Sequence, residues 1–382
     1  MSDNAQPPFA QSLSKGAMLA PRACSWLDAP QEIPLGDNRA RGFTLIELLV
    51  VVAILSAAAL LALGSVDTDR AQLRYGETRN RLALLERAVL GRLGPPDTTL
   101  LGGFVADNGA LPTDVATLLD AGSFASQAVL APVFDPQPDT ATCANNGGGE
   151  TTLSDAGAAL VKGHRGNYLG GAAGNGVFRD GWGNENSDAD ADALNFGWAV
   201  AYNASQESLT LASLGADNQS GGDDYAADQV TTLLATDWLL PIGGWTVRVF
   251  NYTGADIPAR KMHASLLVFA NDASGGRWRR YSTAAATLCL DGTGDGLVGG
   301  APCAQSATLS FSAGCHPGDT STGHHRIPHG RHLLVLVDDN DATPWTADDA
   351  VVFASSPATR PIAAQVNAIA GFALPEARLE MR

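Results

Sequence analysis

The chain has 382 residues, and its 24 Lys and Arg against 40 Asp and Glu give a formal net charge of −16. A surface of that sign repels nucleic acid, so DNA and RNA are not expected as partners. The length exceeds that of one typical domain and suggests two globular units.

The first 42 residues carry no periodic pattern and are neutral in charge. Four basic residues balance four acidic ones: Lys15, Arg22, Arg39 and Arg41 against Asp3, Asp28, Glu32 and Asp37. We interpret residues 1–42 as a disordered cytoplasmic leader that is removed. A start codon assigned too far upstream would account for its length equally well.

An apolar run follows from Phe43 to Leu63, with Glu47 as its one carboxylate. At about 1.5 Å per residue, a helix over residues 43–63 just crosses a hydrocarbon core of about 30 Å, so we predict a transmembrane helix there. Arg39 and Arg41 before the run favour a cytoplasmic N-terminus. A carboxylate one turn inside such a helix is costly, so Glu47 is expected to have a partner.

The string from Arg41 to Glu47, Arg-Gly-Phe-Thr-Leu-Ile-Glu, resembles the processing site of type IV pilins and type II secretion pseudopilins. The resemblance implies that a prepilin peptidase/methyltransferase cuts between Gly42 and Phe43 and methylates the new amine of Phe43. It also implies that Glu47 pairs with the N-terminal amine of a neighbouring subunit. An ordinary signal anchor with a stray glutamate is the alternative interpretation.

A stem helix is predicted to continue through residues 64–93, which would lie in the periplasm. Apolar residues recur there at three- and four-residue spacing, as expected of an amphipathic helix: Leu82, Leu85, Val89 and Leu93. The Gly94-Pro95-Pro96 sequence that follows is expected to end the helix.

Residues 94–235 are predicted to form a small pseudopilin-like head, in which residues 199–202 and 208–211 alternate like a β-hairpin. The segment Asp180-Gly181-Trp182-Gly183-Asn184 resembles the Asp-Pro-Trp-Gly-Asn turn of major pseudopilins, with Gly181 in place of the proline. This resemblance implies that the loop after the hairpin binds calcium through oxygen ligands. The expected ligands are the Leu214 carbonyl and the carboxylates of Asp217, Asp223 and Asp224. A solvated acidic turn is the alternative.

Residues 236–382 contain short alternating or β-branched runs separated by Gly, Asn and Asp clusters. The runs are Trp245–Tyr252, Met262–Ala270, Trp278–Ser282, Thr308–Ser312, His332–Val337 and Ala350–Ala354. This pattern predicts a β-sandwich-like accessory domain. The predicted fold class is therefore α+β: a long pilin-type helix, a β-hairpin head and a C-terminal β-domain.

Four cysteines remain once Cys24 leaves with the leader: Cys143, Cys289, Cys303 and Cys315. An even number in an oxidising compartment predicts two disulfides. At least one bridge is expected to be local, Cys289–Cys303 or Cys303–Cys315, and three connectivities stay open. Five histidines fall between His316 and His332, where no helix is predicted to hold a zinc site, so we interpret them as surface-loop residues.

No nucleotide-binding loop, serine-hydrolase elbow or zinc-protease motif occurs, so no enzymatic activity is predicted. The resemblance implies a structural filament subunit of a type II secretion system or a related type IV pilus, held in the inner membrane with its head in the periplasm. The bulk of residues 236–382 favours a minor or accessory subunit. The alternative is a pilin-anchored adhesin or substrate-recognition protein whose C-terminal domain binds a surface, a glycan or an exoprotein.

The resemblance also implies a set of partners. These are the prepilin peptidase/methyltransferase, other pilin or pseudopilin subunits, an inner-membrane assembly platform, and membrane lipid before assembly.

Overall fold

The computed structural model describes residues 44–91, 101–121, 124, 128–154, 160–170, 176–272, 275–317, 319, 325–339, 345–354 and 360–382. The side chains of residues 61–66, 128–130, 161 and 272 are outside this description. Contacts divide the chain into two compact units, residues 1–62 and 63–382, and each is considered by itself. The predicted leader and both residues of the expected cleavage position, Gly42 and Phe43, lie outside the described residues.

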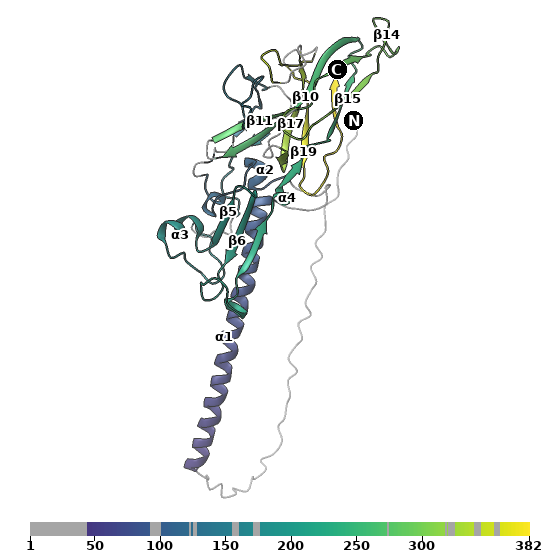
Figure 1. The fold of residues 1–382 in the computed structure, drawn as a ribbon. Coiled ribbons are helices and arrows are strands. Elements are labelled where there is room, and N and C mark those ends of the chain that lie inside the picture. Colours follow the sequence, from purple (N-terminus) through teal and green to yellow (C-terminus); the bar gives the residue numbers. More distant parts are fainter. Residues whose placement is uncertain are drawn as a thin grey trace, which may run out of the picture. The chain divides into compact units, whose positions relative to one another are not determined.

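Helix α1 runs from Leu45 to Leu90 as one continuous element (Figure 1). It ends at Gly91, which adopts a φ of 79° and donates its N–H to the Arg87 carbonyl at 2.8 Å. A Cβ at Gly91 would lie 2.2 Å from the Gly102 carbonyl oxygen, so only glycine fits this turn. The helix therefore ends before the predicted Leu93, because the left-handed glycine stops it ahead of the two prolines.

No helix in the described part of the chain combines the length and the apolar composition that crossing a bilayer requires. The transmembrane helix predicted for residues 43–63 is therefore not supported. Phe43 and the side chains of residues 61–63 fall outside the description.

The second half of α1 carries a small head. Its elements are α2 (Phe104–Asn108), η1 (Ala116–Leu118), α3 (Ala189–Asn195), β5 (Ala199–Asn203), β6 (Ser208–Ser213), η3 (Asp224–Ala226), β7 (Gln229–Leu233) and α4 (Ala235–Trp238). The predicted hairpin is confirmed as β5 and β6, and β7 pairs antiparallel with the other edge of β6. Leu82, Leu85 and Val89 of the stem pack with Phe104 and Trp198 in one buried cluster. The predicted amphipathic face of the stem is thus the face that holds the head.

The rest of the chain is largely β-structure, as predicted. Its longest strands, β10 (Ile257–Asp272) and β17 (Gly330–Asp338), pair antiparallel at the centre of a six-stranded sheet. The other four strands are β11 (Gly275–Ser282), β12 (Ala286–Leu290), β18 (Ala350–Val351) and β19 (Ala363–Ala368). A three-stranded sheet has the order β15-β9-β20, formed by Ser306–Ser310, Thr246–Asn251 and Ala377–Met381, with β9 and β20 parallel.

Short pairs complete the architecture. They are β1 (Ala128–Leu130) with β4 (Leu160–Lys162), β2 (Val133–Phe134) with β3 (Thr151–Thr152), β8 (Leu239–Pro241) with β16 (Arg326–Pro328), and β13 (Leu297–Val298) with β14 (Ala301–Pro302).

The two larger sheets share one apolar core. Alternate residues of β10, such as Ala264 and Leu266, lie in one buried cluster with Val247 and Val249 of β9 and Leu379 of β20. Successive side chains of a strand point to opposite faces, so the three-stranded sheet covers one face of the six-stranded sheet. This is the two-sheet packing expected of a sandwich.

The opposite face of the six-stranded sheet is covered by residues 133–154 together with Leu160, here called the covering segment. Phe134, Leu153 and Leu160 of this segment pack with Phe269 and Trp278 in a separate buried cluster. These residues precede position 235, where the sequence placed a domain boundary, and the predicted boundary is therefore crossed by a shared core.

Two disulfides join the four remaining cysteines. Cys289–Cys303 closes a sequence separation of 14 and is one of the two local pairs expected. Cys143–Cys315 spans a separation of 172 and ties the covering segment to the C-terminal region. A loop of that length would stabilise the fold by about 5 kcal/mol if chain entropy alone decided.

Candidate functional site

The start of α1 is closed by a reciprocal pair of hydrogen bonds between Thr44 and Glu47. The Thr44 backbone N–H donates to Glu47 Oε2 at 3.1 Å, and the Glu47 N–H donates to Thr44 Oγ1 at 3.3 Å. This is a capping box, in which a threonine and a glutamate three residues on satisfy each other's backbone donors. Glu47 thus has a partner within its own chain, at the positive end of the helix dipole.

Apolar side chains surround Glu47 and are exposed. The exposed fraction ranges from 47% for Val51 to 83% for Leu45, and Ile46 and Leu55 lie between these values at 71% and 63%. A contiguous apolar surface of this kind marks a region that another molecule covers.

Beside α1, near Thr78, the Asp180 carboxylate organises the turn that resembles the pseudopilin motif. Asp180 Oδ1 accepts hydrogen bonds from the backbone N–H groups of Trp182, Gly183 and Asn184 at 2.8–3.1 Å. Its Oδ2 accepts from the Asn184 amide at 2.9 Å and from Ser213 Oγ at 2.5 Å. Because Ser213 ends β6, the turn fixes the point at which the following loop leaves the hairpin.

Gly181 brings this turn against the stem. Its N–H donates to Thr78 Oγ1 at 3.0 Å, and a Cβ at this position would lie 2.3 Å from the Arg74 carbonyl oxygen. The proline of the related motif is absent here, and the space beside the helix admits no side chain. The glycine is therefore explained by contact with α1.

The predicted calcium ligands lie in the loop after β6. Asp217 and Asp223 are exposed with Asp224, whose backbone takes a positive φ of 52°, and Leu214 is half-buried at the start of the loop. Asp217 Oδ1 accepts the Gln219 N–H at 3.1 Å, and the Ala216 N–H donates to the Tyr225 carbonyl at 2.8 Å. Within the described residues, the three aspartates are not among the groups whose ligand atoms lie within 4.8 Å of one another. The calcium site stays a prediction.

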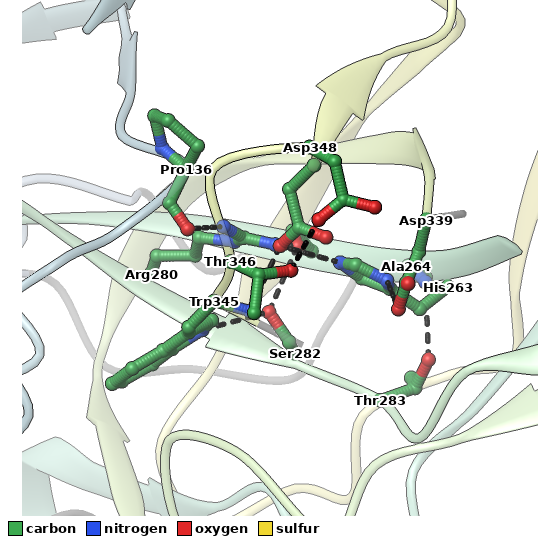
Figure 2. A network of polar contacts seen from close by, with 12 residues as sticks. Pro136, His263, Ala264, Arg280, Ser282, Thr283, Asp339, Trp345, Thr346 and Asp348 are labelled. Carbon is green, nitrogen blue, oxygen red and sulfur yellow. Dashed lines mark hydrogen bonds and ion pairs between the residues drawn. The ribbon is translucent and has the colours of Figure 1, made fainter. Parts of the chain in front are cut away.

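A buried polar network that was not predicted from the sequence lies between the six-stranded sheet and the covering segment (Figure 2). Arg280 is its centre: Nη2 donates to Asp349 Oδ2 at 2.6 Å and to His263 Nε2 at 2.7 Å. Its Nη1 donates to the carbonyls of Asp135 and Pro136 at 3.0 and 2.9 Å. One guanidinium therefore links the covering segment, two sheet strands and the loop that carries Asp349.

The proton positions in this network follow from its geometry. Arginine is only a donor, so His263 Nε2 must be the acceptor and the ring proton lies on Nδ1. Nδ1 is 3.3 Å from Asp339 Oδ2, outside hydrogen-bond geometry, and the imidazole lies between Arg280 and Asp339 (Figure 2). Burial, with Arg280 beside it, lowers the pKa of His263 well below its usual value, which agrees with a neutral ring.

His263, Asp339 and Asp349 have ligand atoms close enough to hold a metal ion. The Arg280 guanidinium, however, already lies against the unprotonated nitrogen and the Asp349 carboxylate, where a metal would bind. The network is therefore structural, and the Arg280 guanidinium occupies the place that a metal cation would take. One pattern in the sequence could have indicated this network. Near one end of β10 and β11, the residues that point into the core are polar: His263, Ser265, Arg280 and Ser282.

The expectation of surface-loop histidines is wrong for His329 and His332, which are both buried. They lie near the buried Lys162, whose ammonium donates to the Ala106 carbonyl at 2.7 Å. Burial lowers the pKa of Lys162 to about 8, and burial together with Lys162 lowers the pKa of His332 to about 3. The two histidines are thus neutral core residues; His324 lies outside the described residues.

The contact between Gly181 and the stem makes a testable prediction. Gly181→Ala should lower the free energy of unfolding by about 1–3 kcal/mol, because its methyl group collides with the helix backbone. Gly76 is a matched control in the same region of α1, with no atom within 4 Å of an added Cβ. Gly76→Ala should instead stabilise the protein by up to about 1 kcal/mol. Urea unfolding followed by tryptophan fluorescence measures both, and equal effects of the two changes would contradict the account of this contact.

Comparison with models of known protein families finds the prokaryotic N-terminal methylation motif at residues 37–63. Comparison with curated proteins and with solved structures gives no significant match. The matched segment contains the expected cleavage position, Glu47 and the first turns of α1. At the start of its long helix, the chain therefore carries the signature of type IV pilins and pseudopilins.

Proposed function

We propose that this protein is a minor or accessory structural subunit of a type II secretion pseudopilus or a related type IV filament. The methylation motif, placed directly before and within the first turns of α1, carries this proposal. By this proposal, a prepilin peptidase/methyltransferase cuts after Gly42 and methylates Phe43. The role is structural, and no enzymatic activity is part of the proposal.

The exposed apolar part of α1 supports assembly with other stems. Burial of apolar surface contributes about 25 cal/mol per Å², so a helix with this exposed face gains stability from any apolar cover. By this proposal, inner-membrane lipid covers it before assembly and neighbouring pilin or pseudopilin stems cover it afterwards. An inner-membrane assembly platform moves the subunit from the first environment to the second.

Glu47 has a second function in this proposal. After cleavage, a neighbouring subunit presents the amine of its Phe43 within the apolar stem bundle. Opposite charges attract strongly in apolar surroundings, and either charge left alone there is costly, so the pair selects the register of the subunits. The capping box supports this role, because it holds the carboxylate at the end of the helix where the amine arrives.

The size of the β-region supports a minor position in the filament. The segment that begins at Val133 packs on the sheets of residues 239–381, so the folded mass beyond the stem is larger than the predicted head alone. Such a mass is difficult to repeat at every position of a close-packed filament. We place this mass in the periplasm and the leader in the cytoplasm.

A calcium ion bound by the loop between Leu214 and Asp224 is a further part of the proposal. The loop begins at Ser213, whose hydroxyl donates to the Asp180 carboxylate, and it contains exposed carboxylates. Calcium coordination by six to eight oxygens would draw these carboxylates together and stiffen the loop beside the stem.

The charge of Glu47 can be separated from its capping role. Glu47→Gln keeps an oxygen that can accept the Thr44 N–H but loses the negative charge. If pairing with the amine drives assembly, Glu47→Gln and Glu47→Ala should both lose filament incorporation while cleavage of the leader continues. The measurement is the fraction of the protein recovered in sheared filaments, by quantitative immunoblotting.

Glu77→Gln is the matched control for this experiment. Glu77 lies on the same helix, half-exposed, and pairs with Arg81 at 2.7 Å. This variant should incorporate as the unaltered protein does. Normal incorporation of Glu47→Gln would show that capping alone suffices and would contradict the amine pairing.

Calcium binding predicts a higher melting temperature. Millimolar calcium should raise the Tm of the purified protein, and Asp217→Ala or Asp223→Ala should remove most of that shift. Magnesium at the same concentration is the control for ionic strength. An unchanged Tm with calcium, or an equal shift in the aspartate variants, would reject these ligands.

A further inference from the structure

The outer face of the three-stranded sheet is open and has an unusual composition for this acidic chain. In β9 the residues Val247 and Val249 point into the core, so Arg248 and Phe250 point outward. The register places neighbours beside them: Thr308 and Arg378 flank Arg248, and Ser306 and Glu380 flank Phe250. Hydroxyl groups, an aromatic ring and arginines therefore share one flat surface.

Two aromatic rings stack against each other on this face. The rings of Phe250 and Tyr252 are nearly parallel, with an interplanar angle of 5° and 5.7 Å between their centroids. Tyr252 is 48% exposed. The guanidinium carbons of Arg248 and Arg378 lie over the Phe250 ring, 5.9 and 5.7 Å from its centroid, so both cations pack against this ring.

The two arginines are direct neighbours in the parallel pair of strands. Arg378 and Arg248 are register partners, and like charges directly opposite each other destabilise a sheet. Glu376 pairs with Arg248 at 3.1 Å. Among the described residues no carboxylate forms an ion pair with the exposed Arg378, so its charge is available to an external anion.

A hollow adjoins these side chains and adds to the positive charge. Its volume is about 310 Å³, and Arg360, Arg378 and Arg382 line it together with Glu380. With Arg248 and Glu376, four arginine side chains lie with two carboxylate side chains on this side of the domain, and Glu376 and Glu380 pair with Arg248 and Arg382. The local charge is therefore opposite in sign to the net charge of −16.

We propose that this face binds an acidic polysaccharide, a chain of sugar rings that carry carboxylates. The exposed Tyr252 ring contacts the apolar face of a sugar ring, and the serine and threonine hydroxyls of β15 bond to its hydroxyl groups. Arg378 takes a carboxylate through charge-assisted hydrogen bonds, for which the guanidinium fork is suited. The remote acidic surface is screened beyond about 8 Å at physiological ionic strength, so it does not prevent contact at this patch.

An acidic sugar fits this face better than an acidic peptide or a nucleic acid. A peptide would use the arginines and the hollow but has no need of an exposed aromatic ring beside a row of hydroxyls. Nucleic acid carries a denser charge along its whole length and meets the repulsion of the rest of the chain. The proposal depends only on the C-terminal sheet, so it stands or falls independently of filament assembly.

The test uses the full-length protein purified in detergent and a fluorescent oligogalacturonate as the probe. The unaltered protein should bind it, and binding should weaken as salt increases. Arg378→Gln should weaken binding by roughly tenfold, as expected for loss of a charged hydrogen bond. Tyr252→Ala should weaken binding by a similar factor. Both residues are exposed, so neither change should alter the melting temperature.

Matched variants on other surfaces control the test. Tyr202→Ala removes a tyrosine that is 47% exposed on β5, and Arg277→Gln removes an exposed arginine on β11. Both should bind the probe as the unaltered protein does. The assignment is overturned by absence of binding at millimolar probe, by equal loss in the control variants, or by equal affinity for polyglutamate or a neutral oligosaccharide. Arg378→Gln should also leave filament incorporation unchanged, and loss of incorporation would indicate a structural role.

Discussion

The main constraint on this protein is that its long helix is covered by its own chain along only one part. From Leu82 onward, one face of α1 is buried under the head, and the apolar side chains there have their partners within the fold. From Leu45 to Leu60 the apolar side chains are exposed, and the chain supplies no cover for them among the described residues. The same helix is therefore a core element from Leu82 onward and presents exposed apolar side chains from Leu45 to Leu60.

Close backbone approach holds the covered part of α1. Gly181, beside Arg74, and Gly91, at the end of the helix, both occupy places where a Cβ would collide with a backbone oxygen. The Asp180 carboxylate accepts five hydrogen bonds, and in this way it fixes the end of the hairpin and the following loop against the stem. In this way the acidic loop proposed to bind calcium is placed beside the helix.

The β-region is held together by contacts between segments that lie far apart in the sequence. Its central strands β10 and β17 are covered on both faces, and the covering segment comes from before the predicted boundary. Arg280 and the Cys143–Cys315 disulfide both connect that segment to the sheets. A buried ion pair is weak evidence for stability by itself, because desolvation offsets much of its attraction. Its geometric effect is clearer: four separate pieces of chain must converge for one guanidinium to be satisfied.

The sequence predicted those elements whose pattern is local. The apolar run with Glu47 identified the helix and its motif, and each of the six alternating runs in residues 236–382 overlaps a strand of the structure. Strands β12, β19 and β20 were missed, because their alternation is weak and pairing with distant strands decides their conformation. The Arg280 network was missed for the same reason, since its partners are far apart in the sequence. The pairing of Cys143 with Cys315 was left open among three connectivities. The buried histidines were misjudged, because a loop-like composition gave no sign that the sheet would enclose them.

The central claim is that the chain is processed as a pilin. Mass spectrometry of the N-terminal peptide, from protein isolated out of cells that contain the prepilin peptidase, tests this most directly. The account predicts a mature chain that begins with N-methylphenylalanine at position 43. A chain that retains residues before Phe43, or one that begins there without the methyl group, would contradict it.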